Sequence, residues 1–269
     1  MADDLAKRFL DLHRERRPLL LPNVWDSGSA KLMRSLGFDA LATTSSGHAA
    51  TLGRLDGSVT RGEALAHAAA IVTATDLPVS ADLENGFADD PEGVAETVEL
   101  ALQTGLAGCS VEDFTNDADD PIYDLDVART RVAAAAEAAH RAPRTLVLTA
   151  RAENHIRGRP DLEDTITRLR AYEEAGADVL YAPGLTSADD IARVVQSIGK
   201  PLNVLARAGA PSITELGELG VSRVSVGGAF AFAALGELCE AALELRDRGT
   251  YSFLERAGSG MRAVREAFE

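Results

Sequence analysis

The chain has 269 residues, 46% of them hydrophobic, and its 42 acidic and 27 basic side chains give a formal net charge of -15. This charge repels phosphate backbones and anionic lipids, so we expect neither nucleic acid nor membrane surfaces as partners. There is no apolar stretch of signal-peptide length at the N-terminus and no apolar run of roughly 18 residues, which predicts a cytoplasmic protein. Cys109 and Cys239 form no zinc-binding spacing and are expected to be reduced packing residues.

Short apolar segments alternate along the chain with longer, Ala-rich amphipathic ones. After an initial helix over about residues 3–16, eight strands are predicted at 19–25, 40–46, 78–84, 108–114, 145–153, 179–184, 201–206 and 223–228. The helical stretches between them include 61–75, 91–105, 126–142 and 161–176, and several begin at Asp or Ser and end at Gly. Eight βα units with strands buried on both faces favour a closed (β/α)8 TIM barrel. No linker interrupts the pattern, so residues 1–269 are expected to form one domain.

Polar residues end most of the predicted strands. In a (β/α)8 barrel the chemistry lies at the carboxyl ends of the strands, where the loops surround a common mouth. The sequence therefore predicts a site at this mouth. The residues concerned are Thr44, Ser45, Ser46, Gly47 and His48 after the second strand, Asp82 and Glu84 at the third, Glu112 and Asp113 at the fourth, Arg151 and Glu153 at the fifth, and Asn203 in the seventh.

The acids at this mouth indicate a metal site. Asp82, Glu84 and Glu112 would repel one another in a partly dry mouth unless a cation joined them, and oxygen ligands select Mg2+ or Mn2+. Each acid could instead be a helix N-cap or a loop anchor. Adjacent strand residues face opposite ways, so only one of Glu112 and Asp113 enters the mouth, and the alternation favours Glu112. Arg151 would bind a carboxylate or enolate, or would serve as a counter-ion to the acids.

The segment "TSSGHAA" predicts a small, hydroxyl-rich turn in which the amide of Gly47 could face an oxyanion, or else an ordinary turn from strand to helix. His48 and His155 lie just past strand ends and are candidates for acid–base work. The other histidines, His13, His67 and His140, fall in predicted helices and are expected to be solvated.

Four blocks of the sequence, "LLLPNVWDSGSAKLMRSLGFDALATTSSGHAA", "DLENGF", "VEDF" and "LTARAE", resemble successive motifs of the isocitrate lyase / phosphoenolpyruvate mutase superfamily. The resemblance covers roughly residues 18–232 in the order and spacing of that superfamily. It implies an α/β barrel, a homotetramer that exchanges the eighth helix between subunits, and Mg2+ that stabilises the enolate of a 2-oxo acid.

The resemblance also assigns roles to single residues. Asp82 corresponds to the leading metal acid, Glu84 to a second acid in a conservative change from Asp, and Glu112 to the Glu of a Glu-Asp pair. Arg151 corresponds to the substrate-binding arginine, and Asp56 to an acid on the loop after the second strand. The amides of the turn and the strand-seven amide would hold the substrate. The catalytic candidates are Arg151, Glu112 and Asp56; the metal candidates are Asp82, Glu84 and Glu112; and the substrate-binding candidates are Trp25, Ser45, Ser46, Gly47, His48, Arg151, His155 and Asn203.

The sequence departs from the superfamily pattern after the fourth strand. Residues 115–124, "TNDADDPIYD", have neither the Lys-x-Cys-Gly-His of the lyases nor the Lys-x-Asn-Ser of the mutases, and Gly184 replaces a lyase Glu. What remains predicts a Mg2+-dependent carbon–carbon lyase, or a decarboxylase of oxaloacetate type, that forms or discharges an enolate. The alternatives are a phosphonopyruvate-type mutase or hydrolase and a non-catalytic 2-oxo acid sensor on the same fold.

Two further segments carry expectations. Residues 230–245 are apolar over more of the helix circumference than one barrel needs, which indicates a helix buried against a neighbouring subunit or a barrel helix with a wide apolar face. The loop "ENHIRGRPD" gathers His155, Arg157 and Arg159 beside Arg151. These residues would either receive a second carboxylate, so that oxaloacetate or 2-oxoglutarate binds better than pyruvate, or pair with the acidic lid "NDADD".

Overall fold

The computed structural model describes residues 2–141 and 145–269. Within these residues nine strands, all parallel, form one sheet in the order β1-β9-β8-β7-β6-β5-β4-β3-β2. Their bounds are β1 (Leu19–Leu21), β2 (Asn23–Val24), β3 (Leu41–Thr43), β4 (Val79–Asp82), β5 (Gly108–Glu112), β6 (Val147–Arg151), β7 (Val179–Tyr181), β8 (Leu202–Leu205) and β9 (Arg223–Ser225).

The two edges of this sheet belong to one segment of the chain. Only Pro22 separates β1 from β2, and proline has no N–H to donate to a strand ladder, so the segment is split there. Because β1 pairs with β9 while β2 pairs with β3, the sheet closes on itself. The predicted TIM barrel is confirmed, with the first of its eight predicted strands in two pieces.

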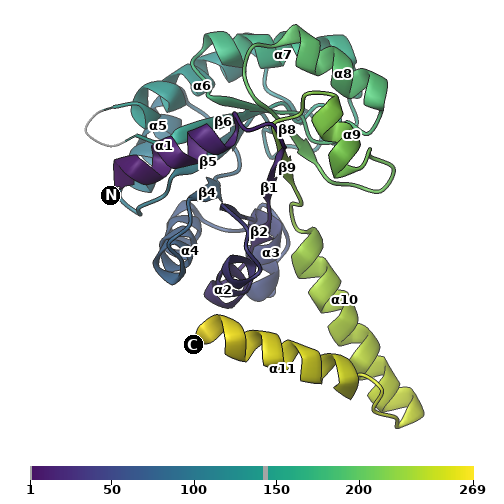
Figure 1. Ribbon diagram of the computed structural model, residues 1–269. Helices are drawn as coiled ribbons and strands as arrows, with labels where there is room; N and C mark the ends of the chain where they lie inside the picture. The colour runs from purple at the N-terminus through teal and green to yellow at the C-terminus, as the bar shows by residue number, and fades with distance from the viewer. Residues whose placement is uncertain (1, 142–144) are drawn as a thin grey trace.

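Helices follow the strands around the outside of the barrel (Figure 1). The helices α4, α5, α6 and α7 confirm the predicted helical stretches, although residue 142, the last of the predicted helix 126–142, lies outside the described residues. Among the described residues, none of these helices is long and apolar enough to cross a membrane. The bounds are α1 (Ala2–Leu12), α2 (Ser27–Ser35), α3 (Ser45–Thr51), α4 (Arg61–Ala74), α5 (Pro91–Leu102), α6 (Leu125–Ala139), α7 (Leu162–Glu174), α8 (Ala188–Ser197), α9 (Ile213–Glu218), α10 (Ala229–Leu243), the π-helical turn Glu244–Arg248, and α11 (Leu254–Phe268).

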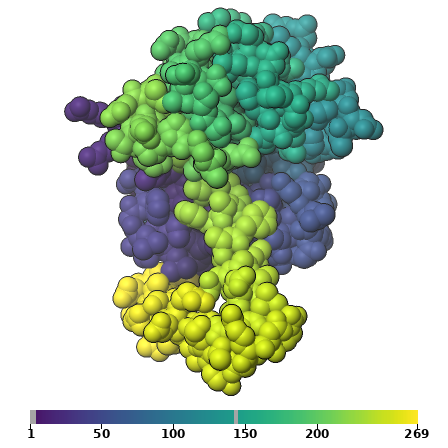
Figure 2. All heavy atoms as spheres, turned by 90° about the vertical axis from the view of Figure 1, so that its right-hand side faces the viewer, coloured from purple at the N-terminus to yellow at the C-terminus, as the bar shows by residue number. Residues whose placement is uncertain are grey.

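The last two helices form an arm, residues 229–268, that leaves the barrel. Helix α10 runs away from the strands, and α11 returns to pack against α2 (Figure 1). In the space-filling view the arm forms a lobe below the barrel (Figure 2). Much of its apolar surface is uncovered, including Phe232, Leu238 and Met261. Cys239 is exposed here, so the expectation that it packs in the interior is wrong for this chain, whereas Cys109 is buried as predicted.

His13 follows α1 and is buried, so the expectation of a solvated ring is wrong. Its Nδ1 lies 2.7 Å from the carbonyl oxygen of Phe9, and its Nε2 lies 3.3 Å from Nη1 of Arg223. Because a guanidinium only donates, Nε2 must accept and Nδ1 must carry the proton. Burial, followed by the charge of Arg223, lowers the pKa of His13 from 6.5 to about 3.

This shift predicts a pH-dependent stability. The unfolded chain takes up a proton on His13 below pH 6.5 whereas the folded chain does so only near pH 3, so the free energy of unfolding should fall between these values. At pH 5 the loss from this residue is about 2 kcal/mol. Urea unfolding at pH 7 and at pH 5 measures it, with His13→Gln as the comparison. An equal loss in the variant and the wild type would contradict the assignment.

Candidate active site

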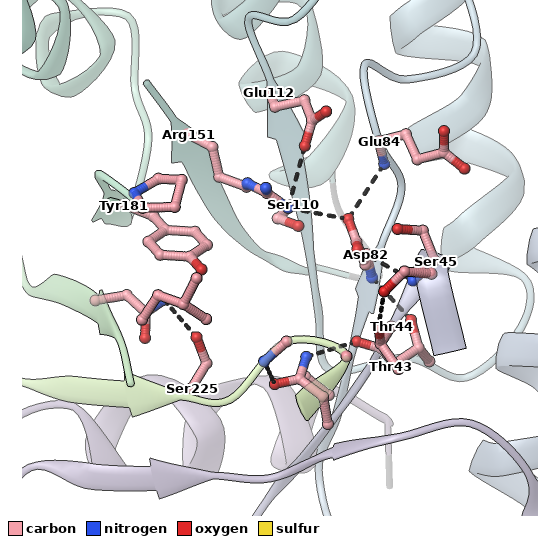
Figure 3. Close-up of a pocket in the computed structure, with 18 of the residues that line it drawn as sticks. Thr43, Thr44, Ser45, Asp82, Glu84, Ser110, Glu112, Arg151, Tyr181 and Ser225 are labelled. Carbon is pink, nitrogen blue, oxygen red and sulfur yellow. Dashed lines mark hydrogen bonds and ion pairs between the residues drawn. The ribbon is translucent and has the colours of Figure 1, made fainter. Parts of the chain in front are cut away.

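A cavity of about 390 Å³ opens at the carboxyl ends of the strands (Figure 3). Strands from all around the barrel contribute to its wall, as the TIM-barrel prediction requires. The structure brings most of the predicted site residues to this cavity. Those that line it are Ser45, Ser46, Asp56, Asp82, Glu84, Glu112, Arg151, Arg157 and Asn203.

Arg151, the last residue of β6, is the centre of the ionic contacts. Its Nη1 lies 3.3 Å from Oδ1 of Asp82 and 3.1 Å from Oε2 of Glu112. Its Nη2 lies 2.7 Å from Oε1 of Glu153. Burial would lower the pKa of Arg151, but the three carboxylates, Glu112 foremost, raise it well above its usual value. The guanidinium is therefore permanently charged, and its ion pairs fix its direction. The ring of Tyr181, whose centroid is 5.0 Å away, helps to hold it in place.

Asp82 and Glu84 reach the cavity by different routes. Both were predicted to lie in one strand, residues 78–84, but β4 ends at Asp82, and Glu84 has a left-handed backbone with φ 48°. This conformation is costly for a residue with a Cβ, and such strain is found where function requires it. Asp82 accepts from the amide of Ser45 at 3.2 Å and from that of Glu84 at 3.4 Å. Burial, then Asp82 and Asp56, raise the pKa of Glu84 to about 8.

The adjacent acids at the end of β5 divide as predicted. Glu112 lines the cavity, and burial raises its pKa well above the usual range although Arg151 opposes the shift. Asp113 points to the other side of the sheet. There it accepts from the hydroxyl of Tyr172 at 2.5 Å, from the amide of Glu153 at 2.8 Å and from Arg168 at 3.2 Å. Asp113 is thus a buried anchor for the helix layer, while Glu112 belongs to the site.

The segment "TSSGHAA" is a helix start rather than a turn. The strand β3 ends at Thr43, and Thr44 caps α3 by accepting from the amide of Gly47 at 3.3 Å. The amide of His48 donates to the carbonyl of Thr44, and that of Ser45 donates to Asp82. Of the turn amides expected to hold substrate, those of Ser46, Gly47 and His48, the last two are therefore used by the helix itself. Ser46 lines the cavity, and its amide, in the first turn of α3, has no intrahelical partner.

Four predicted substrate-binding residues do not line the cavity: Trp25, Gly47, His48 and His155. A Cβ on Gly47 would lie 2.6 Å from Cγ2 of Thr44, so this glycine permits close packing of α3. The ring of His48 stacks on that of His67 at a centroid distance of 3.8 Å, and Nε2 of His67 lies 2.9 Å from the carbonyl oxygen of Trp25. His67 is therefore part of the packing, contrary to the expectation that it is solvated.

The remaining histidines also lie away from the cavity. His155 packs close to Gly184, where an added Cβ would lie 3.0 Å from Cβ of His155. Its Nε2 is buried without a hydrogen-bond partner among the described residues. His140 is partly exposed, and its Nε2 lies 2.8 Å from Oδ2 of Asp178.

The lid and the basic loop meet at the rim. An isolated antiparallel bridge between Phe114 and Ile122 closes the base of the lid, residues 115–121. Arg159 pairs with Asp120 of the lid at 3.0 Å and does not line the cavity, as the alternative interpretation expected. Arg157 does line it, but its Nε lies 3.2 Å from Oε2 of Glu153.

The sequence interpretation missed the inner wall of the cavity. None of these residues is at the carboxyl end of a predicted strand, and their signal is the inward alternation of small or polar side chains where barrels usually carry large branched ones. They are Asn23, Thr43, Ser80, Ser110, Tyr181, Arg223 and Ser225.

The donor set at the mouth suits a hard cation. Among the described residues, no three His, Cys, Asp or Glu side chains are close enough to hold a metal together, and Arg151 lies between Asp82 and Glu112. Mg2+ needs only one or two carboxylates, because it keeps several of its waters. Burial, and then the neighbouring acids, raise the pKa values of Glu84 and Glu112, so a bound cation would favour their charged forms. The residues therefore fit Mg2+ bound partly through water.

Two relatives are similar over much of this chain. A protein of Mycobacterium tuberculosis, named only as an uncharacterized protein, is 35% identical over 241 residues, which cover 89% of each chain. A 2-methylisocitrate lyase of Halalkalibacterium halodurans is 30% identical over 204 residues, which cover 74% of this chain and 66% of the relative.

Solved structures give the same picture. A protein of Burkholderia cenocepacia J2315, described provisionally as a lyase or mutase, is 50% identical with a TM-score of 0.95, and the match covers 98% of this chain and 96% of the other. An oxaloacetate acetylhydrolase bound to its product oxalate is 26% identical with a TM-score of 0.86, over 97% of this chain and 93% of its own. Residues 9–246 match the family described as phosphoenolpyruvate phosphomutase. The chain therefore belongs to this family, within the isocitrate lyase / phosphoenolpyruvate mutase superfamily.

Proposed function

We propose that this protein is a Mg2+-dependent carbon–carbon lyase, of the carboxy-lyase or oxo-acid-lyase type, that binds a 2-oxo carboxylate and stabilises its enolate. One observation carries the proposal: the guanidinium of Arg151 is held between Asp82 and Glu112 at the ends of three neighbouring strands. An enolised 2-oxo acid carries negative charge on its carboxylate and on its enolate oxygen. The fixed guanidinium can meet the first of these charges, and Mg2+ held by the neighbouring acids can meet the second. Relatives named 2-methylisocitrate lyase and oxaloacetate decarboxylase support this class of chemistry.

The residues of the site have separate tasks in this proposal. Mg2+ would be held by Asp82, with Glu84 and Glu112 partly through water, and when bound it polarises the substrate carbonyl. Arg151 binds the substrate carboxylate and shares the charge of the enolate, while Glu112 and Glu153 fix its direction. The free amide and the hydroxyl of Ser46 bind the substrate on the side of α3. Asp56, on the loop that precedes α4, lines the cavity and acts on Glu84, whose pKa it helps to raise.

A substrate panel tests the proposal. Oxaloacetate, 2-methylisocitrate, 2,3-dimethylmalate and phosphonopyruvate are incubated with the protein and Mg2+, or with EDTA, and the loss of each substrate and its products are quantified. Mg2+-dependent cleavage of one of the first three is expected. Turnover of phosphonopyruvate alone would indicate the mutase or hydrolase alternative. Binding of 2-oxo acids without conversion would indicate a sensor.

We also propose that the arm, residues 229–268, is covered by a second copy of the chain in a homotetramer. Phe232 is 51% exposed and Leu238 is 64% exposed, on a helix that the barrel of the same chain does not cover. Apolar surface on this scale is uncommon on a monomer.

Light scattering should therefore give a multiple of the chain mass of 28.4 kDa. The substitution Leu238→Glu places a charge on the exposed apolar surface of α10. It should shift the protein toward smaller species, because burying an unpaired carboxylate in the interface is costly. Glu240→Gln, on the same helix, is the control and should leave the mass unchanged. A wild-type monomer at micromolar concentration would overturn the assembly.

A further inference from the structure

The cavity extends inward to Arg223, the first residue of β9. Glu112, Arg151, Tyr181, Asn203 and Arg223 are successive register partners from β5 to β9. Register partners in a parallel sheet face the same side, and because barrel strands are tilted, such a row descends along the barrel axis. The row begins at the last residue of one strand and ends at the first residue of another, and all five side chains line the cavity. It therefore connects the mouth to the interior of the barrel.

Arg223 is a buried charge without a carboxylate. It is 3% exposed, and its Nη1 lies 3.2 Å from Oγ1 of Thr149 and 3.3 Å from the neutral His13. Its Nε has no hydrogen-bond partner among the described residues. Among the described residues no Asp or Glu is found to act on it; burial lowers its pKa to about 10, a shift that Tyr181 opposes and the charge of Arg151 increases, so it remains charged at neutral pH. An unpaired buried charge of this kind is costly.

The other arginines of the cavity are already paired. Arg151 contacts Asp82, Glu112 and Glu153, and Arg157 contacts Glu153. Among the described residues that line the cavity, the positive charge free to meet an anion is therefore at the inner end and not at the rim.

Asn203 presents a second unpartnered group at the same place. Its Nδ2 donates to Oγ of Ser225 at 2.9 Å, while its Oδ1 is buried without a partner among the described residues. Asn203 is 1% exposed, and it is the register partner of Arg223 on the neighbouring strand. Because the hydroxyl of Ser225 can donate as well as accept, the amide can turn over and point its NH2 into the cavity. Arg223 and Asn203 then offer converging donors.

We propose that the inner end of the cavity is a binding subsite for a carboxylate-type anion, held by Arg223 and Asn203. A guanidinium presents adjacent N–H groups that match a planar carboxylate, and the amide supplies a further donor. The anion is either the second carboxylate of a 2-oxo dicarboxylate substrate, in which case the inference rests on the proposed function, or a separate small anion of the size of formate or hydrogencarbonate.

Formate binding in chloride-free buffer with EDTA tests the subsite without any need for turnover. Calorimetry should detect formate binding to the wild type, with an affinity about ten- to a hundredfold lower in Arg223→Gln, as expected for loss of a charge-assisted contact. Asn203→Asp is a second variant, which tests the subsite even if Arg223→Gln does not fold. It places a carboxylate beside Arg223, so this variant should unfold at the same or a higher temperature and should bind no formate. Arg159→Gln, which alters an arginine outside the cavity, should leave the affinity unchanged.

Competition in the presence of Mg2+ identifies the occupant. If oxaloacetate displaces formate while pyruvate does not, the second substrate carboxylate occupies the subsite; if neither does, a separate anion occupies it. The inference is overturned if the wild type binds no formate, if folded Asn203→Asp binds it as tightly as the wild type, or if pyruvate displaces it as well as oxaloacetate. These outcomes are independent of whether the substrate panel shows lyase activity.

Discussion

Asp82→Asn is expected to remove the affinity of the cavity for Mg2+ and to lower kcat/KM by roughly a hundred- to a thousandfold. Asp82 is the acid on which the proposed metal site depends, and it also accepts from the amides of Ser45 and Glu84 and pairs with Arg151. An asparagine keeps the shape and the acceptor oxygen but loses the charge. Magnesium titration by calorimetry and steady-state kinetics measure the two effects.

The stability of this variant separates a metal site from a structural ion pair. Without metal, the loss of one acid from a crowded group relieves repulsion, so the melting temperature in EDTA should change little. Asp120→Asn is the matched control, since Asp120 lies on the lid, pairs with the exposed Arg159 and does not line the cavity. An Asp82→Asn protein that binds Mg2+ as tightly as the wild type would refute the metal role.

The second large effect is expected at Asp113, the residue that follows Glu112 in the chain. Asp113→Ala should lower the free energy of unfolding by about 3 to 5 kcal/mol, because it leaves the hydroxyl of Tyr172 and the amide of Glu153 buried without their acceptor and removes one of the two carboxylates paired with Arg168. Urea unfolding measures this change. The neighbouring substitution Glu112→Gln should instead abolish activity and change the free energy of unfolding little, because burial already disfavours the charge of Glu112. Equal destabilisation by the two substitutions would contradict the division of roles.

The sequence was sufficient to predict the barrel and the strand-end acids, because both follow from periodicity and from the position of polar residues. The choice of Glu112 over Asp113 needed only the alternation of a strand. Glu84 was placed at the correct site for the wrong reason: its position depends on a left-handed φ, which a strand pattern does not encode.

Other parts of the site depend on contacts between distant segments. The sequence does not indicate that the ring of His48 stacks on His67 of the following helix, away from the cavity. Nor does it indicate that Arg223 enters the cavity, because its inward direction follows from the register between β8 and β9. An arginine next to a valine at the start of a strand is equally compatible with the outer surface.

The bridge between Phe114 and Ile122 closes the base of the lid, from which Asn116 reaches the cavity. The backbone amide of Tyr123 donates to the carbonyl of Asp113, and the backbone amide of Thr115 donates to that of Pro121. The two ends of the lid are therefore held together just beyond β5. A loop whose ends are fixed can change in length at a small entropic cost, since each doubling costs only about 0.6 kcal/mol. Lids of other lengths and compositions can therefore be grafted at this stem while Glu112 keeps its place, which makes the segment an exchangeable cassette for redesigning substrate preference.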